Sequence, residues 1–230
     1  MNDRDSHVRL TLQAWLSPAF PVGAFAYSQG LECAYEAGEL ADAAALRDWL
    51  GMLLEHGPMR NDAILLAVAW QAAHQGGGPL LRETNELALA LANGCERRLE
   101  TSAQGRAFVR TLAASWPSAT FEVLIAALGA RGPAYPVAVA IAAAAHELPL
   151  AATVEAFMFA SLGNAIAAAT RLGVIGQTDA QRLLAEFGRR VPALAQANVA
   201  ASLDDLGSAT VRADIFGFLH ETQYTRLFRT

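Results

Sequence analysis

Apolar residues recur at helical spacing along most of this 230-residue chain, and this periodicity constrains the fold more than any other feature. Between Asp42 and Gly57-Pro58, the leucines and Trp49 follow the i, i+3, i+4, i+7 pattern of an amphipathic helix, with the aspartate as N-cap. Sustained alternation with a period of two residues is absent, and alanine-rich runs such as 142–145 favour helix over strand. The sequence therefore predicts an all-α fold.

Similar patterns predict further helices, and small alanine side chains allow them to pack closely. One begins near Asn61 or Asp62, is apolar almost all round and ends before Gly76 to Pro79, which indicates a buried, central position. The other expected helices cover 8–16, 28–37, 82–115, 119–130, 135–146 and 150–171.

A further amphipathic pattern begins at Thr178 to Gln181, which has the spacing of a capping box. We expect Gly188 and Pro192 to kink or split this helix. The apolar rhythm weakens after Ala201, and no repeat of solenoid period is present. We therefore expect a single multi-helix bundle over residues 1–206, followed by a C-terminal tail, 207–230, that orders on binding a partner.

The composition indicates a chain that is covered in part by other chains. Hydrophobic residues make up 53% of it and charged residues 17%, with a mean hydropathy of +0.25. A net charge of −5 with scattered basic residues argues against nucleic acid as a partner. Prolines and glycines interrupt the uncharged stretch 10–31, and the run 156–170 is too short for a span, so no membrane segment is expected. Cys33 and Cys95 are isolated thiols assigned to core packing, which fits a cytoplasmic location.

The sequence lacks the usual patterns of catalytic and cofactor sites. The triple glycine 76–78 has no Lys-Ser/Thr after it, so we interpret it as a helix connector. The histidines do not occur at ligand spacing and no CxxC is present, so neither a metal nor another cofactor is expected. His146 is expected to cap the end of a helix. The charged stretch Glu96, Arg97, Arg98, Glu100 and Arg106 is interpreted as a solvated helix face.

The stretch Ser17 to Glu32, SPAFPVGAFAYSQGLE, is rich in aromatic residues but contains Pro18, Pro21, Gly23 and Gly30. These residues exclude a regular helix or central strand, so the stretch is expected to be a loop. Loops lie at the surface, which makes its aromatic rings candidates for docking a partner. A buried loop whose rings fill the core is the alternative, and both interpretations remain open.

The segment His220 to Phe228, HETQYTRLF, concentrates residue types that anchor protein interfaces at a terminus that would otherwise fray. The alternative is an ordinary terminal helix that packs Leu219, Tyr224 and Phe228 on the core, with Arg226 paired to a carboxylate.

Both segments resemble signatures of the urease accessory protein F (UreF) family. The first is SPAFPVGAFAYSQGLE and the second is HETQYTRLF. Between them, RRLETSAQGRAFVRTL, AYPVAVAIAAAAHELPL and RLGVIGQTDAQRLL resemble the family's middle blocks in the same order, so the resemblance covers nearly the whole chain. Ala140, Val174 and Ala180 depart from the family pattern and affect details of packing.

The resemblance implies an all-α, dimeric, non-catalytic protein. Such proteins join the UreD (UreH) scaffold and the GTPase UreG in a chaperone complex that loads nickel into apo-urease. The nucleotide site would lie on the GTPase. The motifs carry over as candidate partner-binding residues Phe20, Pro21, Gly23, Phe25, Tyr27, Ser28, Glu32, His220, Glu221, Tyr224, Arg226, Leu227 and Phe228.

Within this set, Phe25, Tyr27, Tyr224 and Arg226 are the first candidates for partner contacts. Arg226 is interpreted as an interface anchor in preference to an arginine finger acting on the partner's nucleotide. Two other classes remain as alternatives: an all-α enzyme with Glu32, His146 or His220 as acid or base, and a structural helical dimer without a role in metallocentre assembly.

Overall fold

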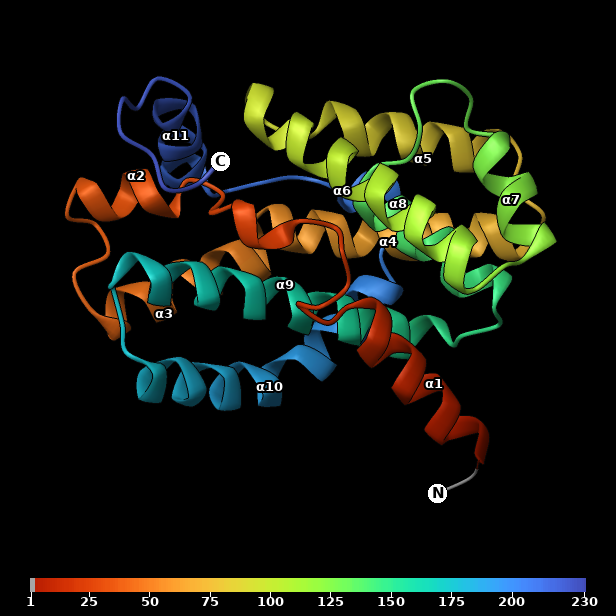
Figure 1. Ribbon diagram of the computed structural model, residues 1–230, viewed down its shortest axis with the longest axis horizontal. Coiled ribbons are helices and arrows are strands. Elements are labelled where there is room, and N and C mark those ends of the chain that lie inside the picture. Colours follow the sequence, from red (N-terminus) through yellow and green to blue (C-terminus); the bar gives the residue numbers. More distant parts are fainter. Residues whose placement is uncertain (1–2) are drawn as a thin grey trace.

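The computed structural model describes residues 3–230, and within this range the regular structure is entirely helical, as the sequence predicts (Figure 1). The α-helices are α1 (Asp3–Trp15), α2 (Leu31–Glu36), α3 (Ala43–His56), α4 (Pro58–His74), α5 (Pro79–Ala90), α6 (Gly94–Ser115), α7 (Ala119–Ala126), α8 (Tyr135–Ala145), α9 (Leu150–Leu172), α10 (Gln177–Val199) and α11 (Val211–His220). Two short 3₁₀ turns, Ala24–Ala26 and Leu203–Asp205, complete the fold.

Helix α8 lies at the centre, packed against α4, α6 and α7 (Figure 1). Its residues from Val137 to Ala143 have no exposed surface. Alanine and valine dominate this stretch, and their small side chains allow the neighbouring helices to approach closely. Gly105 of α6 shows how close this approach is, because a Cβ there would lie 2.1 Å from the carbonyl oxygen of Pro133. Helix α4, which packs against α8, is itself largely buried, so the prediction of a buried, central helix there is confirmed.

Several helix boundaries differ from those expected. The helix expected over 82–115 is two helices, because the chain turns at Asn93 and Gly94, where Gly94 has a φ of +78°. The helix expected over 119–130 ends at Ala126, and α1 and α4 begin earlier than expected. The sequence did contain the Asn-Gly signal for the missed break.

Helix α10 corrects the expected capping box and the expected split, while a kink remains a prediction. It begins at Gln177 with Gly176 as N-cap and no side-chain cap, so the expected capping box at Thr178 is wrong. The helix is not split at Gly188 or Pro192 and runs on to Val199. Its apolar face is buried against α9, and this packing outweighs the local cost of the missing proline donor.

The C-terminal segment, residues 207–230, folds back onto α2 and the loop that precedes it. It contains helix α11, which the sequence did not predict, and α11 packs against α2 and α6 (Figure 1). In α11 the buried side chains are Phe216 and His220. The apolar pattern of α11 is short, which explains why periodicity alone did not predict this helix. Ordering of the segment on a partner remains a prediction.

Helix α9 passes a test of length and composition for a membrane span, with a mean hydropathy of 1.4 in its most apolar window. The helix is longer than the apolar run 156–170, which by itself is too short for a span. Thr153, Phe157, Leu162 and Ile166 are among its buried residues, and the helix packs against α4 and α10. We therefore interpret α9 as a core helix of the bundle.

Candidate functional site

The loop between α1 and α2 combines both roles that the sequence left open. Phe20 and Tyr27 are buried, whereas Phe25 is 69% exposed. Gly23 and Gly30 have φ values of +76° and +80°, which glycine adopts without strain. The loop therefore inserts some of its rings into the core and presents Phe25 on a backbone of fixed shape.

The end of the chain lies along this loop. The amide of Arg229 donates to the carbonyl of Ala26 at 2.8 Å, and the amide of Ser28 donates to the carbonyl of Thr230 at 2.7 Å. The hydroxyl of Ser28 also donates to the carbonyl of Thr230. The two segments that resemble the family signatures thus lie side by side, although about two hundred residues separate them in the sequence.

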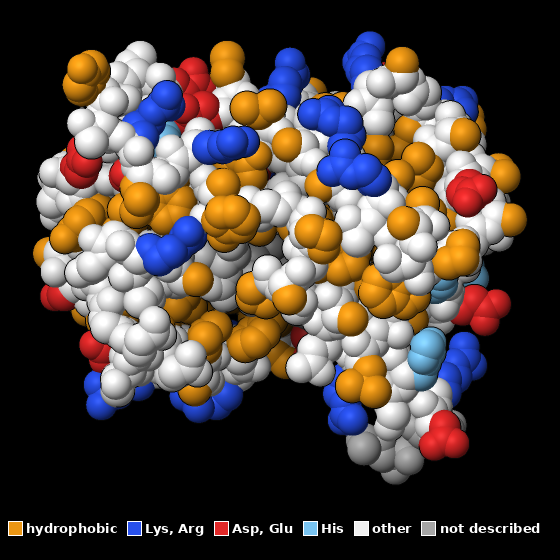
Figure 2. Space-filling view, in the orientation of Figure 1, with side chains coloured by type: hydrophobic (Ala, Val, Ile, Leu, Met, Phe, Trp, Pro, Cys, Tyr) orange, Lys and Arg blue, Asp and Glu red, His pale blue; other side chains and the backbone are white. Residues whose placement is uncertain are grey.

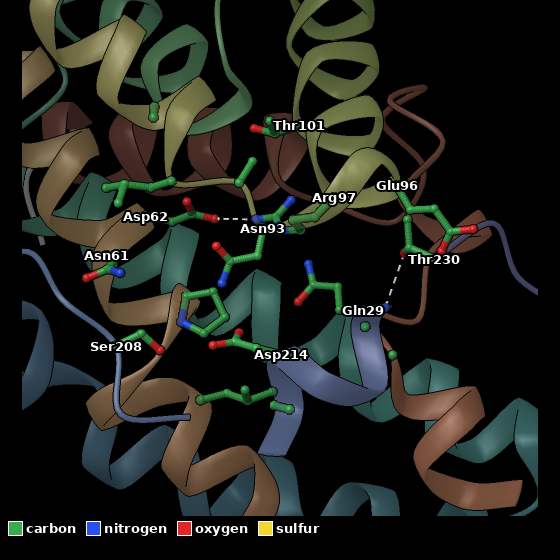
Figure 3. A pocket seen from close by; sticks show the side chains of 18 of the residues that line it. Gln29, Asn61, Asp62, Asn93, Glu96, Arg97, Thr101, Ser208, Asp214 and Thr230 are labelled. Carbon is green, nitrogen blue, oxygen red and sulfur yellow. Dashed lines mark hydrogen bonds and ion pairs between the residues drawn. The ribbon is translucent and has the colours of Figure 1, made fainter. Parts of the chain in front are cut away.

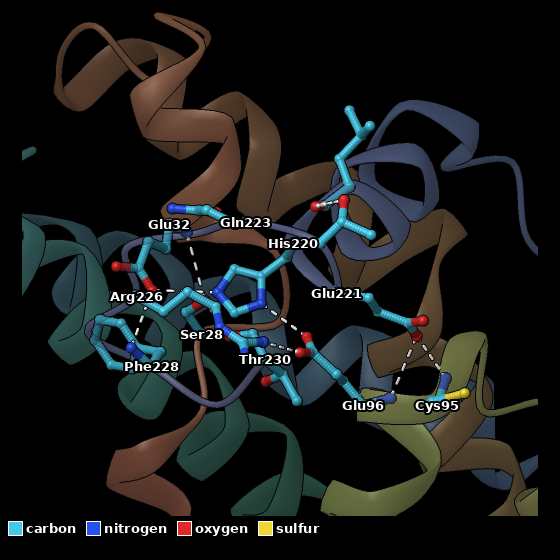
Figure 4. A network of polar contacts seen from close by, with 12 residues as sticks. Ser28, Glu32, Cys95, Glu96, His220, Glu221, Gln223, Arg226, Phe228 and Thr230 are labelled. Atoms are coloured by element: carbon cyan, nitrogen blue, oxygen red, sulfur yellow. Dashed lines mark hydrogen bonds and ion pairs between the residues drawn. The ribbon is translucent and has the colours of Figure 1, made fainter.

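Glu32, in the first turn of α2, holds the backbone of residues 221–230, which follow α11 and which we call the tail from here on. Its carboxylate accepts hydrogen bonds from the amides of Leu227 at 2.6 Å and Phe228 at 2.9 Å (Figure 4). The Glu32 side chain is buried, so a charged group lies inside the protein. Hydrogen bonds to an ionised acceptor are stronger than neutral ones, and these bonds fix the path of the tail.

His220 lies between two carboxylates. Its Nδ1 is 2.7 Å from Oε2 of Glu96, and its Nε2 is 3.2 Å from Oε2 of Glu32 (Figure 4). The other oxygen of Glu96 accepts a hydrogen bond from Arg226 at 2.5 Å. Glu32, Glu96, His220 and Arg226 therefore form one network, which we call the tail network, joining α2, α6, α11 and the tail.

Glu221 makes a second connection to α6. Its carboxylate accepts hydrogen bonds from the amides of Cys95 at 2.5 Å and Glu96 at 3.3 Å (Figure 4). These amides begin α6 and have no partner within the helix, so the carboxylate acts as a cap and interacts favourably with the helix dipole.

Cys95 itself is exposed and Cys33 half-buried, which corrects the core role expected for Cys95.

Part of the charged stretch of α6 is buried, which corrects its interpretation as a solvated face for Glu96, Arg97 and Glu100. Arg98 and Arg106 are exposed, as expected. Glu100 is 1% exposed and is held by Gln29 at 3.0 Å and Gln104 at 3.1 Å. Arg97 pairs with Asp62 of α4 at 2.7 Å and with Glu100 at 3.4 Å. The bonds from Glu100 to Gln29 of the loop and from Arg97 to Asp62 of α4 leave α6, and a helical wheel of α6 alone cannot show them.

The electrostatics of this cluster follow from its burial. Burial raises the pKa of Asp62, and the facing Arg97 offsets this effect only in part. Burial acts to lower the pKa of Arg97, but Glu100 and Asp62 outweigh it and raise that pKa above its ordinary value. Arg97 therefore remains a cation that compensates the buried carboxylates.

The loop and the tail also carry exposed side chains, which we together call the loop–tail surface: Phe25, Tyr224, Leu227 and Arg226, the last of which also belongs to the tail network. Tyr224 is fully exposed and Leu227 is 66% exposed. Arg171 of α9 joins the two segments from below, because its guanidinium donates to the carbonyl of Phe25 at 2.5 Å and lies 4.4 Å from the centroid of the Phe228 ring. Burial lowers the pKa of Arg171.

Two hollows flank this surface. A cavity of about 130 Å³ lies beside α11, with the polar residues Gln29, Asn61, Asn93 and Asp214 among those that line it (Figure 3). A larger groove, about 1340 Å³, runs between α1, the loop, α9 and α10. Figure 2 shows hydrophobic side chains gathered over the middle of the face that Figure 1 presents.

The candidate residues selected from the sequence differ in how far they are buried in the structure. Pro21, Phe25, Tyr224, Arg226 and Leu227 are exposed, and Gly23 and Glu221 are half-buried. Phe20, Tyr27, Ser28, Glu32, His220 and Phe228 are buried. In this arrangement the buried members support the surface from within. Glu96, Arg97, Glu100 and Arg171 belong to the same site, although sequence reasoning did not select them for it.

Other sequence predictions can also be compared with the structure. Among residues 3–230, no group of three or more His, Cys, Asp or Glu side chains could hold a metal ion. His146 caps α8, as expected, and its Nε2 atom is buried without a hydrogen-bond partner. The triple glycine connects α4 and α5, also as expected.

Comparison with known proteins decides the family. Residues 40–188 match the family described as UreF. The chain belongs to the UreF family of urease accessory proteins. Members of this family are non-catalytic, so the alternative of an all-α enzyme is set aside.

Individual relatives extend the similarity beyond the matched range. The urease accessory protein UreF of Rhodopseudomonas palustris strain HaA2 is 53% identical over 95% of this chain and 92% of its own length. The UreF of Xanthobacter autotrophicus is 52% identical over 96% and 90%. That of Bradyrhizobium sp. strain BTAi1 is 46% identical over 100% and 95%. The alignment with the Bradyrhizobium protein spans the whole chain and therefore includes the loop and the tail.

Proposed function

We propose that this chain is an adaptor in urease maturation, which joins a UreD (UreH) scaffold and the GTPase UreG while nickel is loaded into apo-urease. The membership of the UreF family supports a role in this maturation. The observation that carries the adaptor role is the loop–tail surface, where exposed Phe25, Tyr224 and Leu227 are presented by a loop and a tail whose backbones are hydrogen-bonded into one frame. Exposed aromatic and apolar side chains on such a frame are typical of an interface.

Arg226 acts in this proposal as an interface anchor. Its ion pair with Glu96 fixes the guanidinium, its side chain remains 38% exposed, and Leu227 and Tyr224 lie close to it in the sequence. Arginine with a fixed geometry and nearby apolar contacts is a residue type enriched at interface hot spots. An arginine finger is the more demanding alternative, because it requires Arg226 to leave Glu96 and reach the partner's nucleotide.

The proposal includes a homodimer, a cytoplasmic location and a C-terminal segment that orders on binding. The apolar groove supports the dimer, since Phe159, which lines it, is 40% exposed. Free cysteines support a reducing compartment. Partner binding would select the packed state of the segment, in which the tail network is complete.

The test is truncation of the exposed residues. Phe25→Ala and Arg226→Ala are expected to weaken assembly with the scaffold and the GTPase, each by about 2 kcal/mol or roughly thirtyfold, and so to slow urease activation. Assembly is measured by titration of the purified components. The midpoint of thermal unfolding is expected to stay near that of the wild type, because neither side chain is buried.

Matched controls exist on other faces. Val123 of α7 has the same exposed fraction as Phe25, 69%, and Arg182 of α10 is also exposed and paired with a carboxylate. Val123→Ala and Arg182→Ala are expected to leave assembly unchanged. Normal assembly of the Phe25 and Arg226 variants, or equal losses in the controls, would contradict the proposed surface.

A further inference from the structure

Gln29 has a backbone conformation that its side chain disfavours. Its φ is +56°, in the left-handed region, and among residues 3–230 the only other non-glycine residue with a positive φ is Glu147, at +55°. In this region the Cβ of an L-residue crowds a neighbouring carbonyl oxygen, which raises the free energy of the backbone. Such residues persist only where the surrounding structure holds them, and they gather at functional sites.

The tail supplies one set of the contacts that hold Gln29. The amide of Gln29 donates to Oγ1 of Thr230 at 3.2 Å (Figure 3). Beside it, the amide of Ser28 donates to the carbonyl of Thr230 at 2.7 Å. Ser28 and Thr230 are both buried, so water does not replace these bonds in the packed state. The bonds exist only while the tail lies on the loop.

Helix α6 supplies the other contact. The side-chain amide of Gln29 donates to Oε1 of Glu100 at 3.0 Å, and the hydroxyl of Thr230 donates to Oε2 of Glu100 at 3.5 Å. These three residues therefore form a closed ring of hydrogen bonds between the loop, the tail and α6. Without the tail, Gln29 keeps only the bond of its side chain, whose rotatable torsions leave φ free to change.

The position of Gln29 in the chain makes its φ important for the whole loop. Gln29 and Gly30, whose φ is +80°, form the turn through which the loop enters α2. A change of Gln29 to a negative φ alters the direction of this turn. Because α2 packs against α9, the change of direction falls on the loop, which carries Phe25.

We propose that Gln29 is a positioning residue whose left-handed backbone is held by the packed tail, so that release of the tail lets Gln29 relax and turns the loop. Phe25 then lies in its interface position only while the tail is packed. A partner that binds Phe25 in this position therefore also favours the packed tail. The inference rests on the proposed function for the role of Phe25, but its test uses the free protein, so that the two can fail separately.

The test compares alanine and glycine at position 29. Both Gln29→Ala and Gln29→Gly lack the amide that binds Glu100, but only the alanine variant retains the Cβ that disfavours a positive φ. Opening of the tail is measured by hydrogen exchange of the Leu227 and Phe228 amides at one fixed pH. Because the strain is present only in the packed state, Gln29→Ala is expected to open about five- to thirtyfold more readily than Gln29→Gly.

Glu147 provides a matched pair of control variants. It has the same left-handed φ in the turn between α8 and α9, which lies on the opposite side of the molecule from the tail (Figure 1). Glu147→Ala and Glu147→Gly are expected to differ by a similar factor in global unfolding by urea, but to open the tail equally.

Three results would overturn the inference. The first is equal tail opening in Gln29→Ala and Gln29→Gly, which would mean that release of the tail does not relax Gln29. The second is a difference between the Glu147 variants in the tail amides as large as that between the Gln29 variants, which would mean that the tail opens only when the whole protein unfolds. The third is a wild-type chain in which the Leu227 and Phe228 amides are unprotected.

Discussion

Gly30 is the residue on which the packing of the C-terminal segment depends most closely. Its φ of +80° lies in the left-handed region, and a Cβ added there would lie 2.9 Å from the amide nitrogen of Gly217 and 3.2 Å from the carbonyl carbon of Phe216. These atoms belong to the backbone of α11, which cannot rotate away as a side chain could. Gly30→Ala therefore introduces both backbone strain and a collision with α11.

The two costs can be estimated separately. An alanine in the left-handed region costs roughly 1–2 kcal/mol. Forcing a methyl group into a packed contact costs about 1–3 kcal/mol more. We therefore expect Gly30→Ala to lower the free energy of unfolding by about 2–5 kcal/mol in urea denaturation, or to release α11 and the tail locally at a similar cost.

Gly38, at the other end of α2, provides the control. It has a φ of +81°, and nothing lies within 4 Å of the position of its Cβ. Gly38→Ala should carry the strain alone, about 1–2 kcal/mol, and leave the tail amides protected. Equal losses in the two variants, with equal tail protection, would refute the close contact between α2 and α11.

Three further predictions concern the free protein and its complex. Burial lowers the pKa of His146, so its ring stays neutral in the fold. The contribution of this site to the free energy of unfolding is complete above about pH 6.5 and declines as the pH falls through the lowered pKa. In urea denaturation, His146→Phe should therefore lose less stability at acid pH than the wild type or a His74→Gln control. Calorimetry of the isolated chain should detect no sub-micromolar, stoichiometric binding of GTP or Ni²⁺, and such binding would count against the adaptor. Hydrogen exchange over 207–230 should slow when the UreD scaffold binds, whereas equal and strong protection with and without the scaffold would assign the segment permanently to the core.

Much of the fold could be predicted from the sequence, because helical periodicity is a local property. The leucines between Asp42 and Gly57 gave α3 almost to the residue, and the all-round apolar pattern of α4 identified a central helix. Predictions failed where a distant contact decides the outcome. α10 runs through Pro192 because α9 buries one of its faces, and α11 forms where Gly30 leaves space for its backbone.

The segments that form the site could be predicted from the sequence, but which of their side chains are buried could not. The prolines and glycines of 17–32 correctly predicted a shaped loop, and the residue types of 220–228 indicated a special terminus. Which rings face outward depends on the tertiary contacts of Phe20, Tyr27 and Phe228. Glu96 and Glu100 were assigned to solvent because sequence spacing within one helix contains no information on partners in α11, the loop and the tail.

The central claim is that this chain joins other urease maturation proteins through the loop–tail surface. The most direct measurement is co-purification of the tagged wild-type chain and the Phe25→Ala/Arg226→Ala double variant with the UreD scaffold and UreG, followed by nickel-dependent activation of apo-urease. We predict that the wild type recovers both partners and supports activation, while the folded double variant loses the GTPase and activates poorly. A folded double variant that recovers both partners and activates urease at the wild-type rate would contradict the account.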